Sequence, residues 1–253
     1  MSAPEVLFDR AGEAAGAAGP LVTVAVSVFD YAEAVASALD SAAAQTHRNL
    51  ELVVVDDASR DRSAEAVAAW MARHAPRFAR TRLLRHPRNL GLSAARNTAF
   101  AAAEGAAVMV LDADNALLPP AVARLHEALE DAGAACAYSQ LLHHGAGVGV
   151  GVGDVWRREN FLRDNYVDAM ALVRREAWAQ VGGYAPVDYG WEDYDFWCKF
   201  VEAGLTGVYV PELLCRYHVR DRSMVRTETT EERRRLVHGM LARHPWLRLK
   251  VEV

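Results

Sequence analysis

The sequence predicts an α/β fold in which a doubly wound, mostly parallel sheet has helices on both faces. Before about residue 140, short apolar runs rich in β-branched residues alternate with segments of helical periodicity. Such alternation is typical of βαβ units with parallel strands. Two acidic clusters stand directly after apolar runs, and ligands of such sheets bind beyond the carboxyl ends of the strands. The sequence therefore predicts both a fold class and a functional edge of the sheet.

Strands and helices are expected in alternation through this first part. Each strand is an apolar run that indicates burial on both faces, and each helix repeats apolar residues three or four positions apart. The strands are expected at 21–29, 50–55, 81–84, 107–111 and 135–139. The helices are expected at 32–45, around Val67 to His74, at 93–104 and at 121–132.

The regular alternation ends after about residue 140. Residues 143–153 alternate glycine with other residues and are expected to form a mobile loop. They do not match G-x-G-x-x-G and lie at no strand–helix junction, which argues against a dinucleotide fingerprint. The later elements are expected as a strand at 167–173, a helix at 175–181, a helix opening at 190–195, a strand at 207–210 and a closing helix at 231–242.

The composition limits the class of protein. The chain has 253 residues, 52% of them hydrophobic, and a formal net charge of −5. This apolar content is enough for a large domain and excludes general disorder. The mild acidity argues against a nucleic-acid partner, which normally binds a basic surface. No run reaches the roughly 18 apolar residues of a transmembrane segment, although peripheral contact with a membrane stays open.

The N-terminus and the cysteines bear on location. Residues 1–20 have neither the basic nor the apolar segment of a signal peptide, and we expect them to form a flexible leader. The three cysteines are far apart and have no metal-ligand spacing. This usage predicts a reducing, cytoplasmic location.

Asp112 and Asp114 follow the strand at 107–111 with one residue between them. Two carboxylates so close at a strand end can share a divalent cation, Mn²⁺ or Mg²⁺, which prefers oxygen ligands and keeps positions open for phosphates. The alternative is a turn in which Asp114 and Asn115 cap the next helix. The pair alone does not decide between these two interpretations.

Asp57 and Arg96 each allow two interpretations as well. Asp57 follows Asp56 at the end of the strand at 50–55, where a carboxylate can accept a hydrogen bond from a base or a ribose. Alternatively, Asp57 or Ser59 caps the following helix. Arg96 stands early in a helix, where it can pair with a diphosphate near the helix N-terminus, or lie on the surface.

Glu192 and Asp193 open an amphipathic helix. A carboxylate here can accept a proton from an attacking hydroxyl as a general base, although acidic residues are favoured at any helix N-terminus. The surroundings favour chemistry, because carboxylates alternate with aromatic faces that suit a sugar; these neighbours are Asp188, Tyr189, Trp191, Tyr194 and Asp195. His218, expected beyond the last strand, can complete a metal site or contact a phosphate, but a single exposed histidine usually does neither.

Several segments, taken in order, resemble the family 2 glycosyltransferases of the GT-A, Rossmann-like fold over residues 21–225. Their shared order and spacing are more specific than any one segment. The segments are VTVAVSVFDY (22–31), QTHRNLELVVVDDASRD (45–61), NLGLSAARNTAFAAAEG (89–105), VMVLDADN (108–115), GWEDYDFWCKF (190–200) and YHVRDRSM (217–224).

The resemblance implies a role for each matched position. Contacts with the nucleotide base are implied for Ser27, Phe29 and Asp57. Asp114 is implied as a ligand of the metal that bridges the diphosphate, and Asp112 as a residue near the ribose or the metal. Asp193 is implied as the catalytic base, and we assign Glu192 to orienting the acceptor.

Two positions depart from the family pattern. The usual Pro-x-Tyr-Asn after the first strand is Ser27-Val28-Phe29-Asp30 here, so Phe29 keeps a stacking face but lacks the hydroxyl. A histidine common two positions after His218 is Arg220 here. Whether His218 replaces it as a metal ligand, or Arg220 addresses the phosphate, stays open.

These observations predict a metal-dependent, inverting glycosyltransferase. It would move a sugar from a nucleoside-diphosphate sugar, with a UDP-sugar favoured, to a hydroxyl of a carbohydrate or other acceptor. Residues 21–115 would bind the nucleotide, residues 116–225 would bind the acceptor, and residues 226–253 would form a helical tail. One alternative is a non-catalytic sugar-nucleotide-binding protein on the same scaffold. A nucleotidyltransferase is disfavoured because the first strand is not followed by a Gly-rich, basic phosphate loop.

Overall fold

The structure is a computed structural model that describes residues 3–14, 17–187, 190–220 and 232–250. Its strands are β1 (Glu5–Ala11), β2 (Val22–Val28), β3 (Leu50–Asp56), β4 (Arg80–Arg85), β5 (Ala107–Asp112), β6 (Ala116–Leu117), β7 (Cys136–Gly145), β8 (Gly149–Val150), β9 (Ala171–Arg174) and β10 (Gly207–Val219). Its α-helices are α1 (Val35–Ala43), α2 (Ser63–His74), α3 (Leu92–Ala102), α4 (Ala121–Ala132), α5 (Arg175–Gln180), α6 (Glu192–Glu202) and α8 (Arg233–Arg243). Short 3₁₀ turns cover Ala75–Arg77 and Arg158–Leu162.

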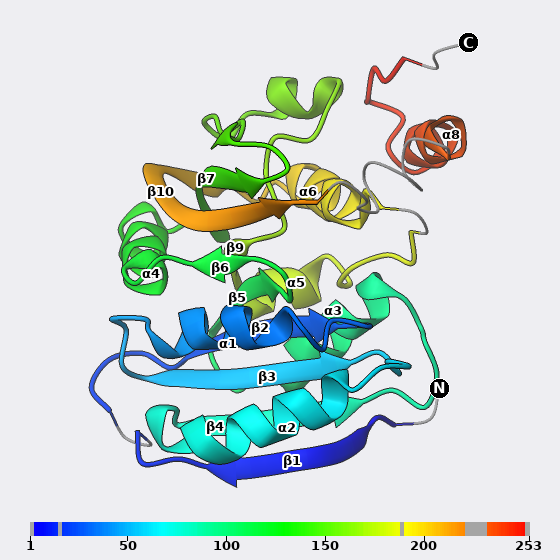
Figure 1. Cartoon of the computed structure of the whole chain (residues 1–253). Helices are drawn as coiled ribbons and strands as arrows, with labels where there is room; N and C mark the ends of the chain where they lie inside the picture. Colours follow the sequence, from blue (N-terminus) through cyan, green and yellow to red (C-terminus); the bar gives the residue numbers. More distant parts are fainter. Residues whose placement is uncertain (1–2, 15–16, 188–189, 221–231, 251–253) are drawn as a thin grey trace.

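The described strands form one mixed sheet in the order β1-β4-β3-β2-β5-β9-β7-β10-β6, with β8 paired to β7 (Figure 1). Strands β4, β3, β2 and β5 are parallel neighbours, and β7 and β10 form a second parallel pair. Between these two groups, β9 runs antiparallel to both β5 and β7. The predicted α/β class with a mostly parallel sheet is confirmed.

Helices cover both faces of the central strands, which explains why these strands are apolar at nearly every position. Successive side chains of a strand point to opposite faces. On one face, Val24 and Leu52 pack in a core to which α1, α2 and α4 contribute. On the other face, Val53 and Val108 pack in a core to which α3, α5 and α6 contribute. Among the described residues, every helix is too short or too polar to span a bilayer.

The prediction of a flexible leader over residues 1–20 is wrong for the segment that forms β1. Residues 5–11 pair antiparallel with β4 at the edge of the sheet. Most side chains of β1 are exposed, so its sequence has little hydrophobic periodicity to reveal a strand. Backbone pairing, the partly buried Phe8 and the ion pair between Asp9 and Arg80 hold it in place.

The sheet also extends further in the second half than the sequence predicts. The expected mobile loop at 143–153 is partly strand, because β7 runs to Gly145 and turns back through β8. The expected strand at 207–210 runs on to Val219, which places His218 within β10 and not beyond it. Parallel pairing between β7 and β10 continues to Gly145 and Val219, and backbone hydrogen bonds do not require apolar side chains. The strand expected at 167–173 begins only at Ala171.

Candidate active site

The candidate site lies at the carboxyl edge of the parallel strands. The register places Ser27 of β2 directly beside Asp112 of β5, and both are only partly exposed. Loops around this edge contain the described non-glycine residues with positive φ, namely Asp30, Ala58 and Trp191. Backbone strain of this kind is concentrated at functional sites. The edge predicted from the two acidic clusters therefore carries loops with left-handed backbone at non-glycine residues.

Arg96 connects two of the predicted site carboxylates. Its Nη1 donates to Glu192 Oε1 over 2.6 Å and its Nη2 donates to Asp112 Oδ1 over 2.9 Å. Arg96 is 3% exposed, so the alternative of a surface arginine is wrong. Burial opposes the charge of Arg96, but Asp112 and Glu192 outweigh it and raise the pKa of the guanidinium. A permanent cation thus links the end of β5 to the start of α6.

Asp114 lies beside a cation and an aromatic hydroxyl. Arg220 Nε stands 3.1 Å from Asp114 Oδ2, as an ion pair whose N–H is not aligned for a hydrogen bond. The Tyr31 hydroxyl donates a long hydrogen bond of 3.4 Å to the same oxygen, and the Arg220 guanidinium lies over the Tyr31 ring at 4.6 Å. Burial and the neighbouring Asp112 raise the pKa of Asp114, although Arg220 opposes this.

The donor set at the end of β5 fits a hard divalent cation in part. The carboxylates of Asp112 and Asp114 repel one another, and Asp114 is partly desolvated. Carboxylate oxygens are the ligands that Mn²⁺ and Mg²⁺ prefer. In the described part of the chain, however, no three His, Cys, Asp or Glu residues are grouped so that they can hold a metal. A cation here would need further ligands from a substrate, such as diphosphate oxygens.

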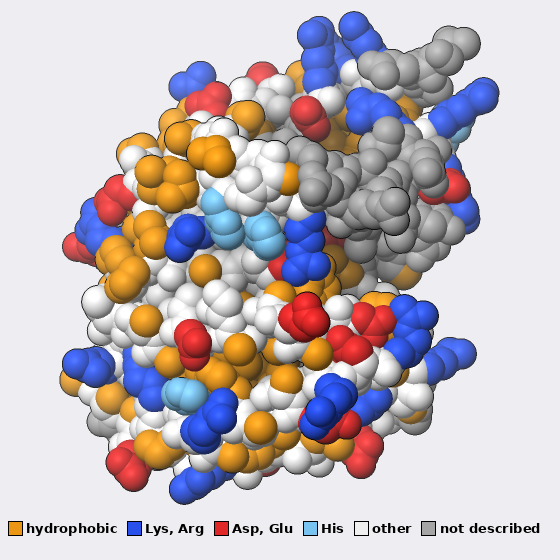
Figure 2. All heavy atoms as spheres, in the orientation of Figure 1, with side chains coloured by type: hydrophobic (Ala, Val, Ile, Leu, Met, Phe, Trp, Pro, Cys, Tyr) orange, Lys and Arg blue, Asp and Glu red, His pale blue; other side chains and the backbone are white. Residues whose placement is uncertain are grey.

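His218 is near enough to Asp114 to favour its ionised form. Its ring stacks on His144 of β7 at 4.9 Å, with only 3° between the planes. Its backbone N–H donates to Asn115 Oδ1 over 2.8 Å. Asn115 therefore ties the end of β5 to β10 and does not cap the next helix, because α4 begins at Ala121 with no side-chain cap. Figure 2 shows histidine side chains side by side on this face, flanked by Lys or Arg side chains.

Asp57 fixes the loop that precedes α3. Its two carboxylate oxygens accept hydrogen bonds of 2.8 Å from the backbone N–H groups of Leu90 and Gly91. His86 Nδ1 lies 2.6 Å from Asp57 Oδ1. The alternative that Asp57 or Ser59 caps the next helix is wrong, since α2 begins at Ser63 without a side-chain cap. Asp57 thereby holds the start of the helix that contains Arg96.

Phe29 presents a face at the same edge. It is partly exposed, and the Arg60 guanidinium lies 5.1 Å from its ring centroid. Arg60 is held there by its Nε and Nη2, which both donate to Oδ2 of Asp30. The positive φ of Asp30 turns the chain after β2. The aromatic ring expected from the sequence thus lies beside the strand ends, with the Arg60 guanidinium over it.

Asp193 is partly exposed at the start of α6. Its Oδ2 accepts a hydrogen bond of 3.0 Å from Asn165 Nδ2, and its Oδ1 accepts one of 2.7 Å from the N–H of Tyr194. Burial, then Glu192 and Asp168, raise the pKa of Asp193 well above its usual range. A carboxyl with a raised pKa is a stronger base when ionised, as proton transfer near neutral pH requires.

The acidic cluster around α6 does not act as one group. Asp195 is fully buried on another side of the helix, where Arg243 Nε donates to its Oδ1 over 2.5 Å and His244 Nε2 lies 3.1 Å away. Trp191 and Tyr194 pack edge to face at 6.0 Å. Asp188 and Tyr189 lie outside the described residues.

Asp168 lies near Asp112 and Glu192, although the sequence pattern does not distinguish it, because it falls within the strand expected at 167–173. It lies in the loop before β9 and is partly exposed. Burial and the charge of Asp112 raise its pKa to about 6. An acidic residue at the start of an otherwise apolar strand was the only available signal in the sequence.

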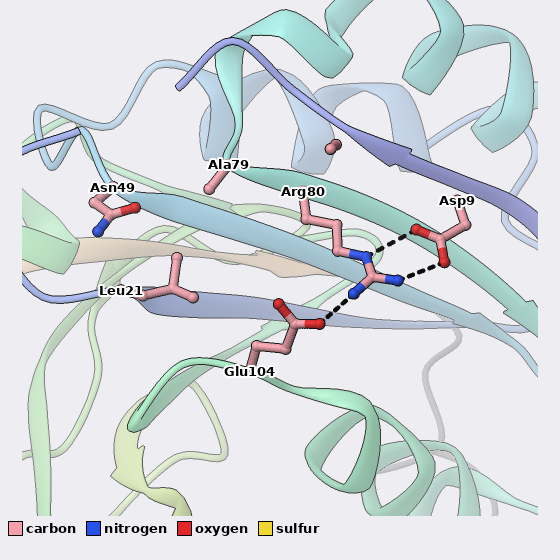
Figure 3. Close-up of a pocket in the computed structure, with 7 residues that line it drawn as sticks. Asp9, Leu21, Asn49, Ala79, Arg80 and Glu104 are labelled. Atoms are coloured by element: carbon pink, nitrogen blue, oxygen red, sulfur yellow. Dashed lines mark hydrogen bonds and ion pairs between the residues drawn. The ribbon is translucent and has the colours of Figure 1, made fainter. Parts of the chain in front are cut away.

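Two hollows lie at opposite edges of the sheet. One, of about 580 Å³, opens at the candidate site beside Asp30, Tyr31, Asp61 and Arg220. The other, of about 560 Å³, lies at the amino ends of the parallel strands, and its residues are Asp9, Ala11, Leu21, Asn49, Ala79, Arg80 and Glu104 (Figure 3). There Arg80 is fully engaged by Asp9 and Glu104. That hollow therefore offers no unpaired charge to a ligand.

Comparisons with known proteins identify the family of this chain. A family model described as "Glycosyl transferase family 2" matches residues 23–184. The succinoglycan biosynthesis protein ExoO of Rhizobium meliloti is 38% identical over 122 residues, which cover 48% of this chain and 33% of that protein. The uncharacterized protein MT1568 of Mycobacterium tuberculosis is 28% identical over 235 residues, which cover 84% of this chain and 70% of that protein. The chain spans about a third of the length of the first curated relatives it matches.

Solved structures show the same fold. The mannosyltransferase PcManGT from Pyrobaculum calidifontis, in complex with GDP-Man and Mn²⁺, superposes with a TM-score of 0.70 at 23% identity, over 92% of this chain and 66% of that one. S. aureus TarS 1–349 in complex with UDP-GlcNAc gives a TM-score of 0.70 at 16% identity, over 87% of this chain and 66% of that one. These likenesses establish the arrangement of strands and helices as GT-A.

Proposed function

This chain belongs to glycosyl transferase family 2, and from that premise we propose that it is a metal-dependent, inverting glycosyltransferase. The observation that supports this most directly is the Glu192–Arg96–Asp112 network. It joins the strand end suited to a cation and a diphosphate to the helix whose next residue, Asp193, is suited to take a proton. A donor bound at the first and an acceptor bound at the second would meet between them.

Asp193 is the proposed general base. It would accept the proton of an acceptor hydroxyl as that oxygen attacks the anomeric carbon and the nucleoside diphosphate leaves from the opposite face. One displacement of this kind inverts the configuration and needs no covalent nucleophile. Asn165 and the N–H of Tyr194 hold the Asp193 carboxylate in place. Glu192 forms an ion pair with Arg96. Its proposed role in orienting the acceptor is therefore to fix the shape of the site.

Asp112 and Asp114 would hold the divalent cation, Mn²⁺ or Mg²⁺, together with the diphosphate. When bound, the cation supplies a Lewis acid that offsets the charge of the leaving group. Arg220 faces Asp114 in the structure, and it would be free to address the phosphates once a cation neutralises that carboxylate. His218 is proposed as an additional contact for the cation or the phosphates, and its ring is oriented by the stack on His144.

The nucleotide would lie along the ends of β2 and β3. Phe29 offers a stacking face to the base, Ser27 stands beside Asp112, and Asp57 is the proposed hydrogen-bond acceptor for the base. We assign 21–115 to the nucleotide and 116–225 to the acceptor. A UDP-sugar is the favoured donor, and GDP-mannose is the second candidate. The described cysteines are free and buried, in keeping with a cytoplasmic location.

The test is a thermal-shift and turnover panel with UDP-glucose, UDP-GlcNAc and GDP-mannose, each with and without Mn²⁺. A specific donor at about a hundred times its Kd stabilises the folded chain by about 2.7 kcal/mol. We expect one donor to give an Mn²⁺-dependent shift together with release of the nucleoside diphosphate.

Asp114→Ala should abolish both the Mn²⁺ dependence and turnover while the fold is kept. Asp9→Ala, at the opposite edge of the sheet, is the matched control and should change neither. If EDTA and Asp114→Ala both leave turnover intact, the metal-dependent mechanism is wrong. A shift without release of nucleoside diphosphate would favour the non-catalytic binding protein.

A further inference from the structure

We propose that Asp168 is a specificity-determining residue that accepts a hydrogen bond from a hydroxyl of the donor sugar. The proposal rests on the function proposed above and deepens it by naming the group that recognises the sugar itself. It depends on where the sheet places Asp168, on what already binds its carboxylate, and on which charges surround it.

The antiparallel direction of β9 brings Asp168 to the functional edge. In the register of β5 and β9, Val108 pairs with Val173 and Met109 pairs with Leu172. When this antiparallel register is continued, the carboxyl end of β5 lies beside the residues that precede β9. Asp112 is the last residue of β5, and Asp168 lies in the loop just before β9. The one antiparallel strand in this part of the sheet thus delivers a carboxylate to an edge otherwise formed by strand C-termini.

The charges that act on Asp168 show that it is near both ends of the proposed reaction. Asp112 and Glu192 repel it, Arg96 attracts it, and Asp168 in turn acts on Asp193. Its field also reaches Tyr217 on β10. Asp112 belongs to the diphosphate end and Asp193 to the acceptor end. Because the transferred sugar must lie between these ends, a group near both faces the sugar ring.

One oxygen of Asp168 is fixed and the other is available. The N–H of Met170 donates to Asp168 Oδ1 over 2.8 Å, which locks the carboxylate in a local turn. Within the described chain, Oδ2 takes part in no hydrogen bond or ion pair. A held carboxylate with one free oxygen is well suited to accept from a single hydroxyl, and hydrogen bonds to ionised groups are the strong ones.

The test separates binding of the sugar from binding of the nucleotide. Asp168→Asn keeps the size of the side chain and an oxygen for the Met170 N–H, and Asp168→Ser keeps a smaller acceptor there if the first variant is unstable. Calorimetry compares UDP with UDP-GlcNAc and UDP-glucose, and GDP with GDP-mannose, all with Mn²⁺. Asp164→Asn, an exposed carboxylate four residues earlier, is the matched control.

We expect Asp168→Asn to weaken the nucleotide sugar about ten- to hundredfold, the range for a hydrogen bond to a charged group. The affinity for the free nucleoside diphosphate should change by less than about threefold. Donors that lack one hydroxyl sharpen the assignment: one deoxy position should weaken binding to the wild type and have no further effect in Asp168→Asn.

Two results would overturn the inference alone. The first is that Asp168→Asn loses the same affinity for the nucleotide as for the nucleotide sugar. The second is that removing any single hydroxyl of the donor weakens binding as much in the variant as in the wild type. A wild-type chain that binds neither UDP-hexoses nor GDP-mannose would instead overturn the proposed function, and this inference with it.

Discussion

Replacing Asp193 by Asn should abolish most of the sugar transfer without unfolding the chain. Asn has the same size but cannot accept a proton near neutral pH. A positioned general base contributes about 10²–10⁴ to a rate, and we expect kcat to fall by that factor while the Kd of the donor is kept. The assay is sugar transfer at saturating donor and acceptor, with donor binding measured in parallel.

The effect on stability can be worked out from the contacts of Asp193. Its pKa is raised in the folded chain above the ordinary 3.8, so the folded state binds the proton more tightly than the unfolded state. Stability from this group is therefore lost as the pH rises through the folded pKa, and the ionised form is unfavourable at neutral pH. Asn removes that penalty but can accept from only one of Asn165 and the Tyr194 N–H. The lost bond costs about 0.5–1.5 kcal/mol, so the two effects oppose one another.

We therefore expect the Tm of Asp193→Asn to stay within about 4 °C of the wild type, since 1 kcal/mol shifts a chain of this size by about 2–4 °C. Asp195→Asn is the control on the same helix. It weakens the contacts with Arg243 and His244 and should lower Tm while transfer per folded molecule is kept. Transfer by Asp193→Asn within about tenfold of the wild type would contradict the base assignment, and a collapse of Tm would assign Asp193 to holding the helix.

Further predictions concern His244 and Asp57. Burial lowers the pKa of His244, but hydrogen bonds with Asp195 and Glu202 outweigh it and raise the pKa above 6.5. The protonated ring therefore adds stability below that pH, and this is lost as the pH rises through the folded pKa. The difference in unfolding free energy between wild type and His244→Gln, measured in urea, should shrink as the pH rises above 6.5. A difference that stays constant with pH would refute this. Asp57→Asn should lower the free energy of unfolding by about 1–3 kcal/mol. The NH₂ group of the asparagine would face the backbone N–H of Leu90 or Gly91 and could not accept its hydrogen bond. An unchanged Kd for the nucleoside diphosphate by calorimetry would remove Asp57 from the base contact.

Periodicity predicted the elements whose stability depends on apolar faces. The helix expected at 121–132 has those bounds in the structure, because its buried residues recur at helical spacing. The same reasoning failed for β1 and for the long pair β7 and β10. Their exposed or polar positions are held by backbone pairing with strands distant in sequence, and no local pattern reports such pairing.

The candidate site shows the same limit at the level of single residues. Asp112, Asp114 and Asp193 could be found because each stands at the end of a recognisable element. The pairing of Arg96 with Glu192 could not be found in this way, because the two residues are 96 positions apart. Nor could the sequence indicate that Asp57 holds the loop before α3. Residue type and position predict which groups reach the edge of the sheet, but only the fold determines which of them neutralise one another.

Helix α6 shows how one short segment serves both stability and chemistry. Asp193 and Asp195 are two residues apart, which places them about 200° apart around a helix of 3.6 residues per turn. Asp195 therefore faces α8, where the hydrogen bonds of His244 and Arg243 lower its pKa despite burial. Asp193 faces the site, where burial, Glu192 and Asp168 raise its pKa. At neutral pH the ionised Asp195 therefore adds to the stability of the fold, and the ionised Asp193 subtracts from it. The segment can keep an unfavourable carboxylate at the site because the other side of the same helix is anchored by a favourable one.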